Sequence, residues 1–175
     1  MTHINIEFKA KCPNPNFIRE LLKSKNAKFK GKDHQIDTYF KTSSGRLKLR
    51  EGNIETALIY YERQNQEGPK QSDIILHHPE PTNITTLKDI LKKIFGILII
   101  VEKNREIYYI ENVKFHIDSV EKLGSFLEVE AIDIDGSFGI QKLQDQCNFY
   151  LDLFKVSKDD LIAQSYSDLL QELRR

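Results

Sequence analysis

The amino-acid sequence predicts an α+β fold, in which an eight-stranded antiparallel β-barrel closes around a charged lumen and about four helices flank it. Short segments that alternate apolar and charged residues predict the strands. Segments with apolar residues three and four positions apart predict the helices. The charged residues of the strands are segregated by sign, and this segregation favours a closed barrel over an open sheet.

The first predicted strand covers residues 4–11, where apolar and polar residues alternate without a break. Pro13-Asn14-Pro15-Asn16 then ends the pairing and supplies a cap for a first helix, which continues with apolar residues at helical spacing. Turn-like stretches such as 42–45 and 67–69 separate four further strands, predicted at 35–41, 45–50, 56–63 and 73–76.

A helix is predicted over 85–95, because its apolar residues share one face and Gly96 provides a C-cap. Alternation resumes after this glycine and predicts strands at 98–105, 106–110, 114–120 and 126–132. The chain ends in two predicted helices, at 140–154 and 158–173.

The chain has 175 residues with 26 basic and 26 acidic side chains, which gives a formal charge of zero. One domain over 1–175 is expected, because no flexible linker interrupts the sequence. Neutral charge argues against binding nucleic acid through bulk positive charge, and the longest apolar run, 97–101, is too short to span a membrane. The N-terminal segment lacks a secretory pattern, so a cytoplasmic location is expected. Cys12 and Cys147 lack metal-ligand spacing and are interpreted as structural, although a disulfide between them stays open.

Charged residues alternate with apolar ones in several strands. Arg46, Lys48 and Arg50 form a row of three cations, and Glu128 and Glu130 lie two apart on a later strand. An open sheet with its charged face in water is the common alternative. Like charges in a row repel, however, unless an anion or opposing carboxylates lie nearby. A sheet that curls until these faces meet gives a barrel with a charged lumen and an apolar exterior for the helices.

Such a lumen suits a polyphosphate bridged to a divalent cation. Lysine and arginine neutralise phosphate oxygens, while carboxylates bind Mg²⁺ or Mn²⁺. Without a ligand the burial of so many charges is costly, so an empty lumen is expected to hold water or an anion.

Segments over nearly the whole chain resemble the CYTH superfamily, also called triphosphate tunnel metalloenzymes. This superfamily includes class IV adenylyl cyclases, thiamine triphosphatases and inorganic triphosphatases, and its fold is an eight-stranded antiparallel tunnel. The last matching segment is similar to the tail of the cyclase-like branch. The matching segments are Asn5–Lys9 (the family motif ExExK), Gln35–Phe40, Gly45–Arg50, Tyr61–Arg63, Glu102–Arg105, His116–Asp118, Leu123–Glu130 and Ser165–Leu170.

The resemblance implies Mg²⁺ or Mn²⁺ as cofactor, with Glu7, Glu128 and Glu130 as metal carboxylates and Asp118 as a further candidate. Together with Lys9, the first three would form the catalytic set. For Lys11 a position on the surface is an alternative to phosphate binding. For Asp37, Tyr39 and His116 a structural role is an alternative to a role in the site. The residues implied to contact the triphosphate are Lys9, Lys11, Arg46, Lys48, Arg50, Arg63, Lys103 and Arg105.

Asn5 departs from the family pattern, because it stands where ExExK has its first glutamate. An amide oxygen can bind a hard cation but contributes no negative charge, so we expect weaker metal binding. If the missing carboxylate serves a second metal, turnover is expected to fall.

The leading functional hypothesis is a class IV adenylyl cyclase-like enzyme that converts ATP to cyclic AMP and pyrophosphate. The alternatives are a triphosphatase acting on thiamine triphosphate, tripolyphosphate or a nucleoside triphosphate, and a binding module without turnover. An RNA 5′-triphosphatase is disfavoured by the neutral charge. The sequence does not decide the oligomeric state, and a homodimer is one alternative.

Overall fold

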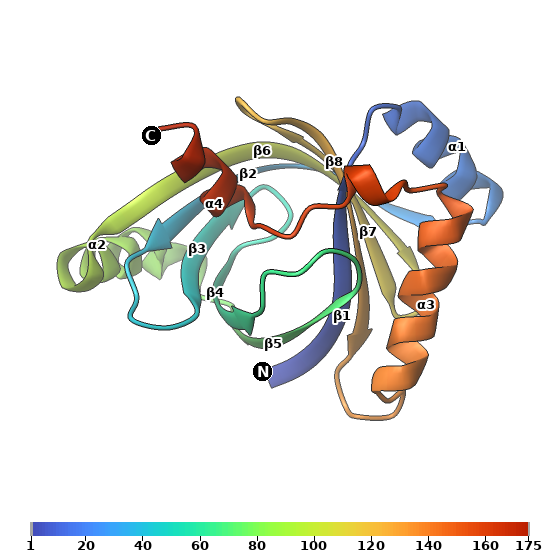
Figure 1. Cartoon of the computed structure of the whole chain (residues 1–175). Coiled ribbons are helices and arrows are strands. Elements are labelled where there is room, and N and C mark those ends of the chain that lie inside the picture. Colours follow the sequence, from blue (N-terminus) through green and yellow to red (C-terminus); the bar gives the residue numbers. More distant parts are fainter. Residues whose placement is uncertain (1, 175) are drawn as a thin grey trace.

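The computed structural model describes residues 2–174, with side chains from residue 3 onward, so the ends of the expected domain at 1 and 175 lie outside this range. Over the described residues, eight antiparallel strands form one closed barrel in the order β1-β5-β4-β3-β2-β6-β7-β8 (Figure 1). The strands are β1 (Thr2–Lys11), β2 (Lys28–Phe40), β3 (Arg46–Gly52), β4 (Ala57–Arg63), β5 (Lys70–His77), β6 (Ile97–Ile110), β7 (Val113–Val120) and β8 (Gly124–Asp133).

Pairing of β1 with strands on both of its sides closes the barrel. Glu7 is the register partner of Lys70 in β5 and of Glu130 in β8. No free strand edge therefore remains between the first and the last strand. The predicted fold class and barrel closure are confirmed.

Helices cover two parts of the barrel exterior, and the described residues form four α-helices and two short 3-10 helices. The outer faces of β1, β7 and β8 pack against α1 and α3 through residues such as Phe8, Phe115 and Leu143. A smaller core joins α2 to the outer face of β3 around Leu49 and Leu91. The helices are α1 (Pro15–Ser24), η1 (Pro81–Asn83), α2 (Ile84–Phe95), α3 (Ile140–Leu153), η2 (Lys158–Asp160) and α4 (Tyr166–Glu172).

The predicted helix caps at the first and second helices are confirmed. The Asn14 side chain accepts a hydrogen bond from the backbone N–H of Phe17 at 3.2 Å. Gly96 ends α2 with φ of 73°, a left-handed conformation that glycine adopts without steric cost, and its N–H donates to Lys92 O.

Two strand predictions need correction. Residues 98–110 form one continuous strand, β6, because the polar residues Glu102, Asn104 and Glu106 all keep pairing with β2. Strand β2 begins at Lys28, seven residues before the predicted start at Gln35. Its first part is polar and carries a register shift near Gly31, so the alternation there is too weak to mark a strand.

The helix predicted over 158–173 is wrong in its first half. Residues 158–160 form a 3-10 turn, and α4 begins only at Tyr166. Between them Leu161 makes a bridge with Ala10, and the Ile162 N–H donates to Lys9 O at 2.9 Å. In Figure 1 this segment and α4 cross one opening of the barrel.

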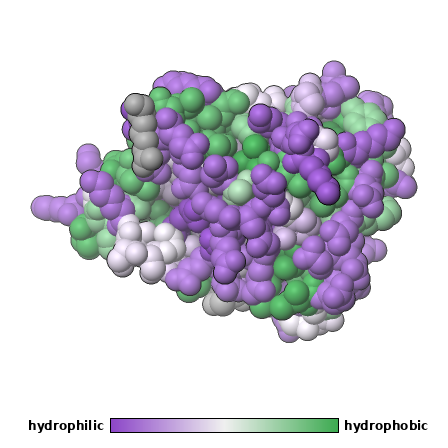
Figure 2. Space-filling view, in the orientation of Figure 1, coloured by the Kyte–Doolittle hydropathy of each residue, from purple (hydrophilic) through white to green (hydrophobic). Residues whose placement is uncertain are grey.

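Neither cysteine forms a disulfide, since Cys12 and Cys147 are both free and buried. The Cys147 thiol donates to Ile6 O at 3.2 Å, which agrees with a structural role. Among the described helices, none combines the length and the apolar character that crossing a membrane requires. The face seen in Figure 2 is mainly hydrophilic over its centre, in front of the barrel.

Candidate active site in the tunnel

Strand alternation places the charged face of the barrel inside. Asn5 and Lys9 of β1 are 2% and 4% exposed, while Ile6 and Phe8 pack outward under the helices. Lys103 and Arg105 of β6 are likewise buried, whereas Glu102 and Asn104 between them are exposed. The inward direction predicted for these charges is therefore observed.

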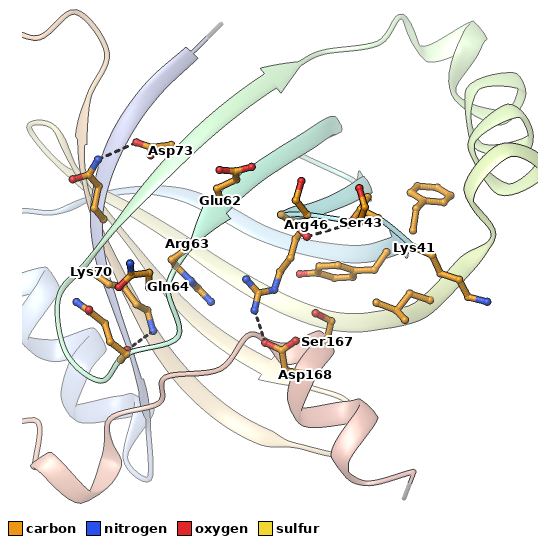
Figure 3. Close-up of a pocket in the computed structure, with 18 residues that line it drawn as sticks. Lys41, Ser43, Arg46, Glu62, Arg63, Gln64, Lys70, Asp73, Ser167 and Asp168 are labelled. Carbon is orange, nitrogen blue, oxygen red and sulfur yellow. Dashed lines mark hydrogen bonds and ion pairs between the residues drawn. The ribbon is translucent and has the colours of Figure 1, made fainter.

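Two cavities lie in the barrel and at one of its ends. One of about 330 Å³ lies inside it, and one of about 1130 Å³ lies at the end formed by the β2–β3 and β4–β5 loops. Tyr39 and Arg63 line both cavities. We call the inner cavity the tunnel and the outer one the vestibule, which Figure 3 shows with Arg46, Lys70 and Asp168 around it.

The tunnel wall carries more positive than negative charge. Among the described residues that line it, eight are lysine or arginine and five are carboxylates. This surplus of cations suits an anionic ligand. The cations are Lys9, Lys30, Lys48, Arg50, Arg63, Lys103, Arg105 and Lys114, and the carboxylates are Glu7, Asp37, Glu55, Glu128 and Glu130.

Asp37 holds three of the predicted phosphate ligands together. Its carboxylate accepts from Lys48 Nζ at 2.9 Å, from Lys103 Nζ at 2.7 Å and from Arg50 Nε at 2.8 Å. Burial would raise the pKa of Asp37, but Arg50, Lys103 and Lys48 hold this pKa well below its ordinary value. Burial lowers the pKa of Lys103 to about 7, although Asp37 opposes the shift. One carboxylate therefore positions a triad of cations without neutralising it fully.

Arg63 presents unused hydrogen-bond donors to the tunnel. Its Nη1 donates to Glu7, while Nε and Nη2 are buried without a partner among the described residues. A buried guanidinium with free donors is costly unless an acceptor from outside the chain binds there. Glu7, predicted to bind metal, is thus an ion-pair partner of Arg63.

Glu128, Glu130 and His116 bring three possible metal ligands together, within 4.8 Å of one another. His116 Nδ1 lies 3.4 Å from Glu128 Oε2 and 3.6 Å from Glu130 Oε1. Both ring nitrogens are buried without a hydrogen-bond partner in residues 3–174. Burial and Arg105 lower the pKa of His116 to about 3, so the ring is neutral and can serve as a ligand. Burial raises the pKa of Glu130 to about 7.

Glu128 is also bound by cations. Lys9 Nζ lies 2.7 Å from its Oε1, and Arg105 donates to its Oε2. Burial would raise the pKa of Glu128, but Lys9 and Arg105 hold it well below its ordinary value. Glu128 is therefore ionised and connects Lys9 and Arg105 to the cluster of possible metal ligands.

Asp118, the further metal candidate, has different partners. Arg105 Nε donates to it at 2.7 Å and the Tyr166 hydroxyl donates to it at 2.7 Å. Asp118 lies outside the cluster formed by His116, Glu128 and Glu130. Its position indicates that it orients Arg105 and anchors α4.

The start of α4 is built into the tunnel wall, which Ser165 and Tyr166 line. The Tyr166 ring lies under Lys9 Nζ at 3.8 Å from the ring centroid. Lys70 Nζ donates to Ile162 O at 3.0 Å and to Ala163 O at 2.9 Å. Arg46 donates to Asp168 at 2.8 Å across the vestibule, as the dashed line in Figure 3 shows.

Lys11 does not reach the tunnel, which corrects its prediction as a phosphate ligand. It is exposed at the last position of β1 and is absent from the residues that line either cavity. Its register partner is Phe126, which belongs to an apolar cluster with Val101 and Tyr166. At this level of the barrel, apolar side chains and α4 fill the interior. Lys11 therefore lies outside, although it shares the alternation of Lys9.

Several site residues were missed by sequence reasoning. Asp37 and His116 were left open, while Glu55, Lys114 and Tyr166 were not considered as tunnel residues. Lys114 shares the alternation of His116 and Asp118, a signal that could have identified it. Part of the wall is apolar, and this part was also missed; it consists of Ala57, Ile59, Tyr61, Ile74 and Leu76.

Comparison with known proteins decides the family, because residues 3–166 match the model of the CYTH domain. The chain belongs to the CYTH domain family. Proteins of this family are metal-dependent enzymes that act on triphosphates. The match begins at the second residue of β1 and covers β2 to β8 completely.

Relatives of this CYTH chain include a Methanocaldococcus jannaschii protein provisionally named an adenylate cyclase, 30% identical over 95% of this chain and 98% of its own. The solved structure of protein PH1012 from Pyrococcus horikoshii is 26% identical, with a TM-score of 0.69, over 94% of this chain and 98% of its own. A Hippeastrum protein, provisionally named an adenylyl cyclase and described as having a dominant triphosphatase activity, shares the fold. Its TM-score is 0.62 at 13% identity, over 97% of this chain and 95% of its own.

Proposed function

We propose that this CYTH protein is a Mg²⁺- or Mn²⁺-dependent enzyme that cleaves ATP in its tunnel to cyclic AMP and pyrophosphate. The Methanocaldococcus relative, which aligns along nearly the whole chain, supports the cyclase reaction by its provisional name. Glu7, Lys9, Glu128 and Glu130 are the proposed catalytic residues. The proposed phosphate ligands are Lys9, Arg46, Lys48, Arg50, Arg63, Lys103 and Arg105.

The observation that carries this proposal is that the tunnel, together with the His116 ring beside its Glu128 and Glu130, has unpaired groups of both kinds. Arg63 offers two free donor nitrogens, while Asn5 Oδ1 and the His116 nitrogens include acceptors without a partner in the described chain. Free donors require an anion, and free acceptors require a cation or a further donor. A triphosphate with a divalent metal ion supplies both.

The residues present fit a divalent cation. Glu128 and Glu130 offer carboxylate oxygens, and His116 offers a neutral nitrogen close to both. The Asn5 amide oxygen, buried and unpaired, is a further candidate. A nitrogen ligand among carboxylates favours Mn²⁺ over Mg²⁺, which prefers oxygen ligands. When bound, the ion would neutralise phosphate charge and polarise the bond to the leaving group.

The chain's own residues would position the phosphates and stabilise the charge that develops on them. In cyclisation, a bond forms between the ribose O3′ and the α-phosphorus, and the bond from the α-phosphorus to pyrophosphate breaks. The proton of the 3′-hydroxyl leaves to water or to the released pyrophosphate. Lys48, Arg50 and Lys103 are already fixed by Asp37, so they stabilise the leaving pyrophosphate without reorganising.

The apolar part of the wall supports an organic triphosphate over an inorganic one. Ile59 and Tyr61 of β4 and Ile74 of β5 line the tunnel beside the cations. Phosphate groups gain nothing from such a surface, whereas a nucleoside gains from burying its base there.

A triphosphatase that releases orthophosphate is the second candidate. The Hippeastrum protein of the same fold is described with this activity. Asn5 removes a carboxylate that a second metal ion would use, which is expected to lower turnover in either reaction. A triphosphate-binding module without turnover is the third candidate, also because of Asn5. Restoring the carboxylate with Asn5→Glu is then expected to tighten Mn²⁺ binding in calorimetry.

Incubation of the purified protein with ATP, thiamine triphosphate or tripolyphosphate, each with Mg²⁺ or Mn²⁺, tests the proposal by chromatography of the products. Cyclic AMP and pyrophosphate support the cyclase, and orthophosphate supports the triphosphatase. Glu130→Gln is expected to lower turnover about 100-fold. Glu102→Gln, on the exposed face of β6, is the matched control. Full metal-dependent turnover by Glu130→Gln would contradict the metal site.

A further inference from the structure

The β3–β4 loop reaches into the end of the tunnel opposite the vestibule. The loop lies at 53–56, whereas the loops at 41–45 and 64–69 that border the vestibule are at the other end of the antiparallel barrel. Ile54, Glu55 and Thr56 line the tunnel. One of them, Glu55, brings a carboxylate into a row of phosphate-binding cations.

A buried carboxylate fixes the position of this loop. Asp33 is fully buried and accepts from the backbone N–H groups of Ile54 at 2.8 Å and Glu55 at 3.0 Å. Gln35 Nε2 donates to the same carboxylate at 2.7 Å. A Cβ added at Gly52 would lie 2.6 Å from Glu55 O and 2.8 Å from the Asp33 carboxylate, so the close packing requires glycine. Glu55 is therefore held by rigid packing.

The Glu55 carboxylate pairs with three cations of the tunnel wall. Its oxygens lie 2.7 Å from Lys114 Nζ, 3.5 Å from Arg50 Nη1 and 3.9 Å from Lys30 Nζ. Burial would raise the pKa of Glu55, but Lys114 and Arg50 hold it well below its ordinary value. Glu55 therefore stays ionised and offsets part of the positive charge of these cations.

Arg50 lies between the cations that surround Asp37 and the cations that pair with Glu55. Its Nε donates to Asp37 within the triad of phosphate ligands, and its Nη1 faces Glu55. A phosphate placed beyond Arg50 would approach a fixed carboxylate and would lose Lys114 and Lys30 as partners. The part of the tunnel wall whose cations are available to phosphate thus ends at Glu55, because the cations beyond it, Lys114 and Lys30, are paired with this carboxylate.

We propose that Glu55 ends the phosphate-binding section of the tunnel and is a specificity-determining residue, which excludes linear polyphosphates longer than triphosphate. This inference rests on the proposed function in one respect, that the triphosphate binds in the tunnel. It assigns to the chain a selection by phosphate number, in addition to any selection for the organic group.

Calorimetry with linear tripolyphosphate and tetrapolyphosphate in EDTA tests the inference without turnover. Wild-type protein is expected to bind tetrapolyphosphate no more tightly than tripolyphosphate. Glu55→Gln keeps the size of the side chain and removes its charge, which frees Lys114 and Lys30 for a further phosphate. We expect the preference of this variant for tetrapolyphosphate to increase about tenfold, equivalent to about 1.4 kcal/mol.

Two further variants sharpen the test. Glu51→Gln is the matched control, because Glu51 pairs with Lys88 at 2.6 Å on the outside of the barrel, and it should keep the wild-type preference. Glu55→Asp retracts the charge by one methylene group and should shift the preference partly. An unchanged ratio in Glu55→Gln and Glu55→Asp, with tripolyphosphate still bound, would overturn the role of Glu55 alone. Absence of binding of either chain by wild-type protein, both in EDTA and with Mn²⁺, would overturn the proposed function together with this inference.

Discussion

The buried charges around Asp37 are arranged so that the cations keep some capacity to bind an anion. Lys48, Arg50 and Lys103 share one carboxylate, Asp37, so their combined charge exceeds that of their partner. Such a cluster is unfavourable in an empty protein, because desolvation outweighs the attraction of imperfectly paired charges. A phosphate chain would complete the pairing, so at the residue scale the cost of burial is coupled to ligand binding.

Lys103 makes this coupling measurable as a function of pH. Burial lowers its pKa to about 7 in the free protein, and a phosphate beside it would raise that pKa. Above pH 7 the free protein has largely lost this proton, so phosphate binding must take one up. We predict that tripolyphosphate binding at pH 8.5 takes up a proton that Lys103→Met does not, as measured by calorimetry in two buffers of different ionisation enthalpy.

Lys103 also makes the stability of the free protein depend on pH. The unfolded chain binds the Lys103 proton up to its ordinary pKa of 10.5, whereas the folded chain releases it near 7. Since the unfolded state then binds more protons, the contribution of Lys103 to the free energy of unfolding rises with pH between these values.

In the binding experiment, tripolyphosphate itself ionises in the same way with both proteins. Equal proton uptake by wild type and Lys103→Met would therefore contradict the assignment of this proton to Lys103.

At the scale of elements, strand alternation predicted the strands, and the segregation of their charges by sign predicted a barrel with the charged face inside. Alternation fixes which side chains share a face but not which neighbours they meet across strands. The convergence of three cations on Asp37 therefore depends on the registers of β2 with β3 and β6, which turn lengths and bulges set. For the same reason Glu7 was predicted as a metal ligand without its pairing to Arg63 being visible.

The C-terminal segment shows why the last helix was mispredicted. Leu161 and Ile162 fit a helical stripe, yet their backbone pairs with β1 and with Lys70. Tertiary contacts outweigh local helical preference here. The sequence did hold a correct signal, because Ser165 and Asp168 form a capping box that starts α4 at Tyr166.

Lys70 is expected to hold this segment on the tunnel. Its Nζ donates to three carbonyl oxygens, of Gln66, Ile162 and Ala163. Lys70→Met removes these bonds while keeping an apolar stem of similar length. We predict that hydrogen exchange of the Ile162 amide accelerates at least about tenfold, corresponding to about 1.4 kcal/mol of local stability.

Lys23→Met, at an exposed position of α1, is the control for Lys70→Met and should leave that amide unchanged. Slow exchange of Ile162 in Lys70→Met would show that its bond to Lys9 O holds the segment without Lys70. Faster exchange throughout β1 to β8 would indicate global destabilisation instead of local release.

At the scale of the whole molecule, closure of the barrel explains how a chain of zero net charge can hold a polyanion. Basic and acidic residues are equal in number over 175 positions, yet the described tunnel wall carries eight cations against five carboxylates. The barrel thus concentrates positive charge where screening by water is weak. Composition alone could not reveal this, because it averages the lumen with the outer surface.

Ligand binding should therefore stabilise the entire barrel, whose strands all contribute side chains to the tunnel wall. A ligand that binds only the folded state at 100 times its Kd adds about 2.7 kcal/mol to the free energy of unfolding. For a domain of this size each kcal/mol corresponds to a rise in Tm of roughly 2–4 °C. We predict that saturating tripolyphosphate, in EDTA, raises Tm by about 5–11 °C in calorimetric scans. Sulfate at equal ionic strength should raise Tm far less, because one tetrahedral anion cannot contact the Asp37 triad and Arg63 together. Equal shifts with both anions would indicate general salt stabilisation, and they would remove the tunnel as the binding site.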